Sequence, residues 1–198
     1  MRPKGAMARP SKASGTVPAT DDEIREKYLE RAIRELNLLT REIQECDHCP
    51  RGNLMPVLGS GHPQADIFLL KFAPVPSEIE EGVAFYGRAG SALMKSFKRL
   101  GIDPLAVYGT VFVKCPVHDT DDSAPDCRAR VLEELNDLRV PLGRQLEWKP
   151  GELQRLTPSL EALVVPDIDR SLDDEQAKRE FWGAFRALGE WYADFPPY

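Results

Sequence analysis

Two stretches of the chain place apolar residues at helical spacing over several turns. The first covers roughly 21–45, where apolar side chains recur every three or four residues and predict one long amphipathic helix. Thr20, with Glu23 three residues later, has the form of a capping box at the start of this helix. The second stretch, 173–192, carries aromatic residues at helical steps and predicts the last helix.

Shorter helices are predicted between these two. Ser91 is suited to cap a helix over 92–100, which Gly101 ends. Apolar residues on one face predict a further helix over about 128–138. Glycines and prolines across 55–64 predict an irregular loop instead.

Short apolar runs at 65–72, 107–114 and 160–165 are typical of buried strands. Strands that alternate with helices favour a parallel sheet covered by helices on both faces. The pattern is poor over 139–158. We therefore expect an α/β protein without internal repeats.

Composition agrees with one globular domain. The chain has 198 residues, of which 42% are hydrophobic. We expect a single domain over 21–198, preceded by a disordered basic tail over 1–20. The net charge of −6 argues against strong non-specific DNA binding. No apolar run reaches the roughly 18 residues that predict a membrane span, and four cysteines in a domain of this size fit a reduced cytoplasm.

The four cysteines lie in one segment, at Cys46, Cys49, Cys115 and Cys127. Thiolates bind soft metals, and four of them suit either zinc or an iron–sulfur cluster. Structural zinc sites more often use two close pairs, whereas here one close pair joins two single cysteines. This pattern does not decide between an iron–sulfur cluster, a zinc ion and unligated buried cysteines. His48, beside the first pair, is interpreted as a loop residue.

Short motifs follow one another in a specific order between the first and last cysteines. They are Cys46-Asp47-His48-Cys49, Arg51, Leu58-Gly59-Ser60-Gly61, Ala65-Asp66-Ile67, Ala73-Pro74, Ala84-Phe85-Tyr86-Gly87-Arg88-Ala89-Gly90, Gly101-Ile102, Thr110, Lys114-Cys115 and Cys127. In this order the chain resembles the iron–sulfur uracil-DNA glycosylases, a group within the uracil-DNA glycosylase superfamily.

The resemblance implies a three-layer α/β/α sandwich around a central, mostly parallel four-stranded sheet, with 139–158 as a rebuilt or shortened part. It implies a [4Fe-4S] cluster on the four cysteines, with zinc as the alternative. It also implies a cytoplasmic monomer that acts on DNA by hydrolysing N-glycosidic bonds. The residues that it assigns to base binding are Phe72, Ala73, Pro74, Phe85, Gly87 and Arg88.

Three positions depart from the family pattern, so no catalytic residue is assigned. Phe72 stands where relatives have the Glu that helps to activate or position water, and Val111 stands where they have the Asn that reads uracil. The His-Pro-Ser loop of the family is best matched by 165–168, which contains no His. Candidate substitute acids, each also explained as a solvated side chain, are Glu78, Glu80, Glu81, Asp167 and Asp169.

Two hypotheses follow: a divergent glycosylase, or a binding or structural relative that keeps the fold and the cluster but not catalysis. We expect Phe72 and Phe85 to form an apolar slot that stacks a base without reading its edge. Such a slot predicts weak, base-tolerant, salt-sensitive binding to single-stranded DNA, aided by Arg88, Lys95 and the basic tail. The alternatives are that Phe85 is a core residue, and that Lys95, Lys98 and Arg99 form a solvated flank of the helix.

Overall fold

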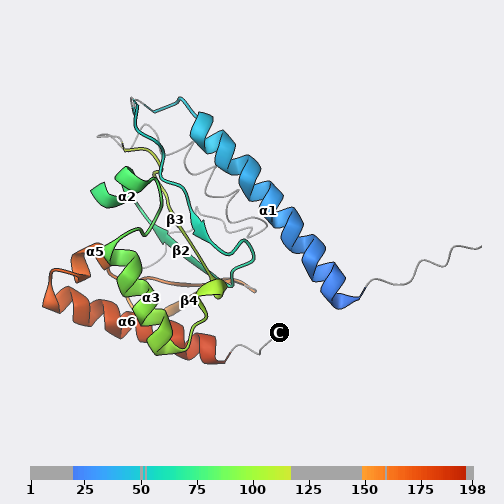
Figure 1. The fold of residues 1–198 in the computed structure, drawn as a ribbon. Coiled ribbons are helices and arrows are strands. Elements are labelled where there is room, and N and C mark those ends of the chain that lie inside the picture. Colours follow the sequence, from blue (N-terminus) through green and yellow to red (C-terminus); the bar gives the residue numbers. More distant parts are fainter. Residues whose placement is uncertain (1–19, 50, 52, 117–148, 159, 195–198) are drawn as a thin grey trace, which may run out of the picture.

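A computed structural model describes residues 20–49, 51, 53–116, 149–158 and 160–194 (Figure 1). These residues form a mixed α/β structure with a three-stranded and a two-stranded sheet. In chain order the elements are α1 (Asp21–Glu45), β1 (Ser60–Gly61), β2 (Ile67–Lys71), α2 (Pro76–Glu81), α3 (Arg88–Leu100), the 3-10 turn η1 (Pro104–Ala106), β3 (Val107–Val111), β4 (Leu153–Thr157), β5 (Leu160–Leu163), α5 (Ile168–Ser171) and α6 (Glu175–Ala193).

The long first helix is confirmed, and so is its capping box. The Glu23 amide donates to the Thr20 hydroxyl at 3.3 Å, and the Thr20 amide donates to the Glu23 carboxylate at 2.9 Å. Two otherwise unpaired amides at the helix start are thereby satisfied. Figure 1 shows α1 along one side of the three-stranded sheet, with α3, α5 and α6 on the other.

The three-stranded sheet has the order β1-β3-β2. β2 and β3 are parallel, in a register that runs from Ile67 opposite Val107 to Lys71 opposite Val111. The short β1, within the predicted irregular loop, pairs antiparallel with β3. The parallel pair that the two apolar runs predicted is confirmed.

The third predicted strand is not part of the three-stranded sheet. Residues Leu160–Leu163 form β5, which lies antiparallel to β4 in the separate two-stranded sheet. Only residues 158 and 159 separate these strands, and so short a connection can join antiparallel strands but not parallel ones. The described residues therefore show no central four-stranded parallel sheet. The Trp191 indole of α6 donates to the Glu161 carboxylate at 2.7 Å and ties this hairpin to the last helix.

The core lies between the parallel strands and the helices α3, α5 and α6. Phe97 of α3 is fully buried, and its ring centroid is 5.5 Å from that of Phe185 on α6. Phe181 stacks on the other side of the same cluster, 5.0 Å from Phe185. The buried residues of the cluster are Ile67, Ala89, Leu93, Phe97, Ile102, Val107, Ile168, Phe181, Phe185 and Leu188.

Helix boundaries differ from the sequence-based expectation in two places. Residues 76–81, for which no helix was predicted, form α2, and α3 begins at Arg88 with Gly87 as its N-cap, earlier than the predicted helix over 92–100. Gly87 has a φ of +81°, a left-handed conformation that glycine adopts without steric cost and that lets the helix start earlier.

The predicted last helix over 173–192 is confirmed as α6, and the short α5 precedes it. Asp174 caps α6 by accepting the amides of Gln176 and Ala177 at 2.7 and 2.9 Å. These two hydrogen bonds hold the pKa of Asp174 below its ordinary value. The predicted basic tail and the helix predicted over 128–138 lie outside the described residues. Within the described part of the chain, no helix is long and apolar enough to cross a membrane.

Candidate functional site

The candidate site lies where β2 and β3 end. Because the two strands are parallel, their carboxyl ends meet at the same edge of the sheet, with Lys71 beside Val111. In open α/β sheets, ligands bind in the crevice at this edge. The segments that follow β2 supply α2 and Phe85, and α5 approaches from the far end of the chain.

A buried ion pair occupies this edge. The Lys71 ammonium is 2.7 Å from the Glu78 carboxylate and 2.8 Å from that of Asp169. Glu78 is fully buried, whereas the Lys71 and Asp169 side chains are 11% and 25% exposed. A buried carboxylate is costly unless it is paired and hydrogen-bonded, so these contacts are what make Glu78 tolerable.

Glu78 is brought to this position by the start of α2. Pro76 stands in the first turn, where its missing N–H leaves no extra unsatisfied group. Glu78 then reaches back to accept the Val75 amide at 2.8 Å. Its other carboxylate oxygen accepts the Phe85 amide at 2.5 Å. The Glu78 side chain thus connects Val75 and Phe85, at the two ends of this loop, to Lys71.

Phe85 is held rigidly. It is the one non-glycine with a left-handed φ, +57°, in the part of the chain that the structure describes. A Cβ on Gly90 would overlap the Phe85 carbonyl oxygen, and a Cβ on Gly109 would lie 2.7 Å from the Phe85 ring. The two glycines therefore make room for the half-buried ring. The Lys71 ammonium lies 5.5 Å from its centroid, within cation–π range.

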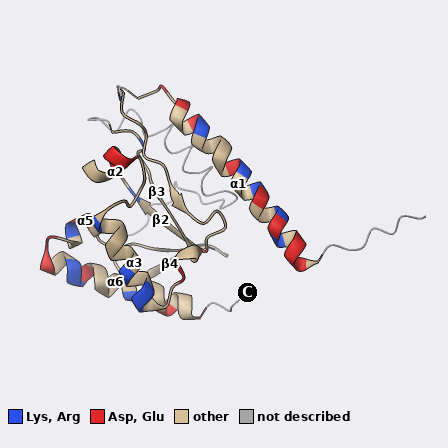
Figure 2. Ribbon diagram, viewed as in Figure 1, with Lys and Arg blue, Asp and Glu red and all other residues tan. Residues whose placement is uncertain are grey.

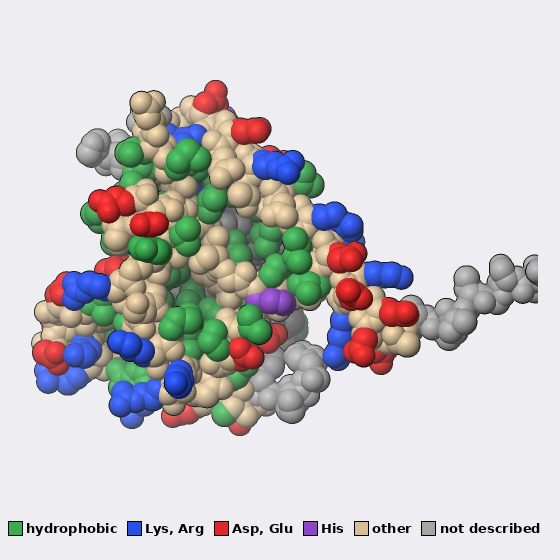
Figure 3. Space-filling model, in the orientation of Figure 1, with side chains coloured by type: hydrophobic (Ala, Val, Ile, Leu, Met, Phe, Trp, Pro, Cys, Tyr) green, Lys and Arg blue, Asp and Glu red, His purple; other side chains and the backbone are tan. Residues whose placement is uncertain are grey.

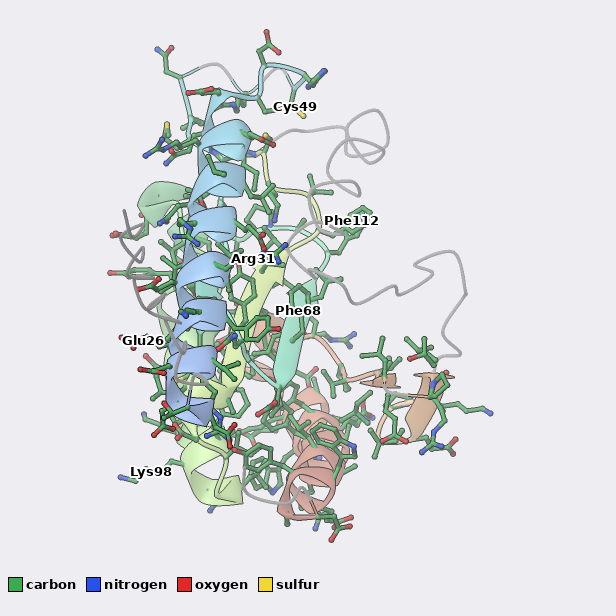
Figure 4. All side chains as sticks on the ribbon, turned by 90° about the vertical axis from the view of Figure 1, so that its right-hand side faces the viewer. Glu26, Arg31, Cys49, Phe68, Lys98 and Phe112 are labelled. Carbon is green, nitrogen blue, oxygen red and sulfur yellow. The ribbon has the colours of Figure 1, made fainter. Side chains whose placement is uncertain are left out.

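The two aromatic residues that were expected to form a slot, Phe72 and Phe85, have different neighbours. Phe72 is 60% exposed, and its ring stacks on Phe112 with a centroid separation of 5.9 Å. Successive residues of an extended strand point to opposite faces, so Phe72 points away when Lys71 faces Phe85. Figure 4 labels Phe112, the partner of Phe72. Lys71 thus takes the place beside Phe85 that Phe72 was expected to have, and the half-buried Ala73 and Pro74 follow.

Arg88 forms an ion pair with Asp173. Its guanidinium is 2.7 Å from the Asp173 carboxylate, and both side chains are largely exposed. The hydrogen bond with Asp173 raises the pKa of Arg88 above its ordinary value. A phosphate would have to compete with this exposed ion pair, which is worth little in water.

The five candidate acids differ in their surroundings. Glu80, Glu81 and Asp167 are exposed, and Asp167 caps α5 by accepting the Arg170 amide at 3.1 Å. Glu78 and Asp169 instead meet at Lys71. The site therefore contains two of the five.

Basic residues of α3 and α6 lie on a separate surface. Figure 2 shows them as blue segments of these ribbons, and Figure 3 shows blue side chains gathered over this part of the molecule. Lys95, Lys98 and Arg99 are exposed, and the Arg99 guanidinium lies 5.1 Å from the Trp182 ring centroid. Lys95 and Arg99 also line a cavity of about 370 Å³ between α3, α5 and α6.

The cysteine segment begins at the end of α1, where Cys46 is the C-cap. Arg51 donates to the carbonyl oxygens of Leu54, Gln44 and Cys46 at 2.7, 2.8 and 3.0 Å. These bonds satisfy carbonyls that the helix end leaves unpaired and fix the loop that carries Cys49. Figure 4 shows Cys49 just beyond this end of α1.

The third cysteine follows β3. The Val57 amide donates to the Lys114 carbonyl at 2.7 Å, which anchors the loop after the first cysteine pair beside Cys115. Cys49 and Cys115 are buried, and Cys46 is half-buried with its sulfur 3.2 Å from His48 Nδ1. Cys127 lies outside the described residues. The thiols suit a soft metal, but among the residues described no group of three or more His, Cys, Asp or Glu is arranged to hold one.

Comparison with known proteins supports the resemblance. No protein-family model matches the chain. A Type-4 uracil-DNA glycosylase of Pyrobaculum aerophilum is 36% identical over 85 residues, 41% of this chain and 42% of that protein. That of Archaeoglobus fulgidus is 24% identical over 188 residues, 80% of this chain and 94% of that protein. That of Saccharolobus solfataricus is 30% identical over 122 residues, 55% and 56% of the two chains.

These similarities support a relationship of the chain to the uracil-DNA glycosylase superfamily. The named relatives are all Type-4 uracil-DNA glycosylases. The chain spans less than half of the Pyrobaculum protein. It spans nearly all of the Archaeoglobus protein, but with the lowest identity of the three. The activity of this chain does not follow from these similarities.

Two site residues had weak sequence signals. Lys71 is a charged residue at the end of an apolar run, which predicts a strand end without predicting a partner. Glu78 follows Pro76 by two residues, a spacing that indicates the first turn of a helix. From the sequence, Glu78 was one of five candidate acids, each also explained as a solvated side chain.

We predict that Glu78→Gln destabilises the protein by about 3–5 kcal/mol, because it leaves the mostly buried Lys71 without its nearest counter-charge. Urea denaturation measures the change. Glu80→Gln, an exposed position on the same helix, should change stability by less than about 0.5 kcal/mol. Adding Lys71→Met to Glu78→Gln should recover part of the loss, because the two charges leave together. Equal effects at positions 78 and 80 would contradict the role assigned to Glu78.

Proposed function

We propose that the protein is a divergent, iron–sulfur, uracil-DNA glycosylase-like protein that binds DNA and holds an unstacked base against Phe85. The rigid placement of Phe85 at the ligand-binding edge of the sheet is the observation that carries this proposal. Aromatic rings hold bases by stacking, and an extruded base is how proteins of this kind reach a single nucleotide.

Efficient uracil excision is not part of the proposal. Phe72 stands where the resemblance expects a water-activating Glu, and its exposed ring stacks on Phe112. Val111 is fully buried and offers no hydrogen bond from its side chain. The nearby Glu78 has both oxygens engaged, by two amides and the Lys71 ammonium. A carboxylate so bound is poorly placed to activate water.

Hydrolysis of an N-glycosidic bond is the second candidate, and Asp169 is the observation that favours it. This carboxylate is partly exposed, and one of its oxygens, Oδ2, binds Lys71. Its other oxygen, Oδ1, receives no hydrogen bond from the described residues. A carboxylate with a free oxygen can position a water molecule or accept its proton.

The proposed cofactor is a [4Fe-4S] cluster held by Cys46, Cys49, Cys115 and Cys127, with zinc as the alternative. Its role would be structural, because it would tie the end of α1 to the end of β3. The buried state of Cys49 and Cys115 supports this assignment, as does the similarity to Type-4 enzymes. We further propose that the protein acts as a monomer in the cytoplasm, where thiols stay reduced.

Anaerobically purified protein should be brown and absorb broadly near about 400 nm, because four thiolates are the usual ligands of such a cluster. Absorbance and iron analysis measure this. Cys49→Ala should abolish the absorbance and lower thermal stability, since metal binding and folding are coupled. His48→Ala is the matched control and should keep the colour. Colourless protein with one zinc per chain would contradict the cluster.

Uracil release should be low from both single- and double-stranded DNA. The Val111 site lacks the donor and acceptor that discriminate a polar base edge, and such groups supply most of the selectivity of a pocket. The assay compares uracil, hypoxanthine and xanthine with a Type-4 enzyme run in parallel. Uracil release at the rate of that enzyme would contradict the prediction. Release that Asp169→Asn abolishes would support the second candidate function instead.

Phe85→Ala should weaken binding to single-stranded DNA by about 1–3 kcal/mol, the usual contribution of one base stacked on an aromatic ring. Fluorescence anisotropy at fixed salt measures the affinity. Phe72→Ala is the matched control and should leave affinity unchanged, because its ring stacks on Phe112 instead. If Phe85→Ala lowers the melting temperature but not the DNA affinity, Phe85 is a core residue only.

A further inference from the structure

A cavity lies between three helices on one side of the three-stranded sheet. Its volume is about 370 Å³, and the helices that enclose it, α3, α5 and α6, pack on one another (Figure 1). Small-molecule sites typically have volumes of about 300–1,000 Å³, so the cavity is large enough to hold a ligand. Its lining does not include Lys71, Glu78 or Phe85. The cavity is therefore separate from the candidate site at the edge of the sheet.

The buried part of the cavity lining is largely apolar. Ile168 of α5 and Phe181 of α6 are buried, and Leu172 beside them is half-buried. The hydroxyls of Ser96 and Ser171 donate to backbone carbonyls one turn earlier in the chain, at 2.9 and 2.7 Å. Because these two protons are already used, the inner part of the cavity offers mainly apolar contact, which favours an apolar ligand body.

The exposed part of the lining is positively charged. Its charged residues are Lys95, Arg99 and Lys178, and among the described residues no carboxylate lines the cavity. Lys178 is paired with Glu175 at 3.0 Å, but this contact is exposed and worth little in water. Lys95 and Arg99 have no carboxylate partner in the part of the chain that the structure describes. The cavity therefore has a surplus of positive charge, which favours an anion.

Arg99 is held in position by the ring of Trp182. Its guanidinium lies 5.1 Å from the ring centroid, within the range of a cation–π contact. This attraction depends on the charge of the guanidinium and uses none of its N–H donors, which stay available to an anion. A side chain already held in place loses little ordering entropy when a ligand binds. Because Arg99 lies over the Trp182 ring, the apolar part of a ligand would contact Leu172 and Phe181 instead.

We propose that the cavity between α3, α5 and α6 binds a small amphipathic anion, a phosphate or carboxylate group on a compact apolar body. Arg99 and Lys95 donate charge-assisted hydrogen bonds to the anionic group, and the apolar body packs on Leu172 and Phe181. A neutral apolar molecule would leave the two cations unused, and a bare inorganic anion would leave the apolar lining in water. The inference does not depend on the proposed base binding, because the two sites share no residue named for either.

The test compares the affinities of four probes by isothermal titration calorimetry at low ionic strength. Naphthyl phosphate and naphthoate carry both an apolar ring system and an anionic group, whereas naphthol carries the ring system alone and inorganic phosphate the anion alone. The better of the two amphipathic anions should bind about 10- to 100-fold more tightly than naphthol or inorganic phosphate, because ring burial and charge-assisted hydrogen bonds each add affinity. The difference between the two amphipathic anions identifies the preferred anionic group.

Lys95→Met and Arg99→Met remove the charges and keep an unbranched side chain. Each should weaken binding of the better amphipathic anion by about 3- to 10-fold. Lys98→Met is the matched control and should leave the affinity unchanged, because Lys98 is an exposed lysine of the same helix that does not line the cavity. Ala92→Leu fills part of the cavity and should weaken the amphipathic anion but not inorganic phosphate. Circular dichroism of every variant establishes that it is folded.

Three results would overturn the inference. If inorganic phosphate binds as tightly as both amphipathic anions, the basic residues are only an electrostatic surface. If Lys95→Met and Arg99→Met leave the affinity unchanged, or Phe85→Ala abolishes it, the probe binds outside the cavity. If single-stranded DNA at an equal phosphate concentration displaces the probe, the cavity belongs to a nucleic-acid surface. Loss of DNA binding in Phe85→Ala with unchanged probe affinity would support both the proposed function and the separate cavity site.

Discussion

The candidate site depends on the buried carboxylate of Glu78. Its two oxygens accept the amides of Val75 and Phe85 and the ammonium of Lys71, so one side chain connects the end of β2, the start of α2 and the aromatic ring. A fully buried charge that lost any of these partners would keep the cost of desolvation without the compensating contacts. The loop between β2 and α3 can therefore hold only a narrow set of conformations. Phe85 adopts its left-handed backbone within that constraint.

Two anchored regions lie along the same pair of strands. At one, Arg51 and the Val57–Lys114 hydrogen bond hold the cysteine-bearing loop against the end of β3. At the other, the ion pair of Lys71 holds α5 against the end of β2. The first region carries the cysteine motifs on which the family resemblance rests, and the second carries Lys71 and the aromatic ring of Phe85.

Phe72 and Lys71 are neighbours in the chain with different partners. The Phe72 ring stacks on Phe112, whereas the Lys71 ammonium lies over the Phe85 ring. The nearby Glu78 carboxylate has both oxygens engaged by two amides and the Lys71 ammonium. A carboxylate so bound is poorly placed to activate water, which is why base binding is proposed ahead of hydrolysis.

The sequence by itself determined the elements whose cause is local. The 3.6-residue periodicity and the capping box of Thr20 and Glu23 predicted α1, the apolar runs predicted β2 and β3, and ordered motifs indicated the family. Tertiary structure alone decided how the site is assembled. Lys71 and Asp169 are 98 positions apart and meet only because α5 packs on α3, and no periodicity encodes a contact of that range. The same holds for β5, whose apolar run fitted either sheet until its two-residue connection to β4 closed a hairpin. Local patterns report which face of a segment is buried, but the partner of a buried charge depends on segments that the chain brings together only on folding.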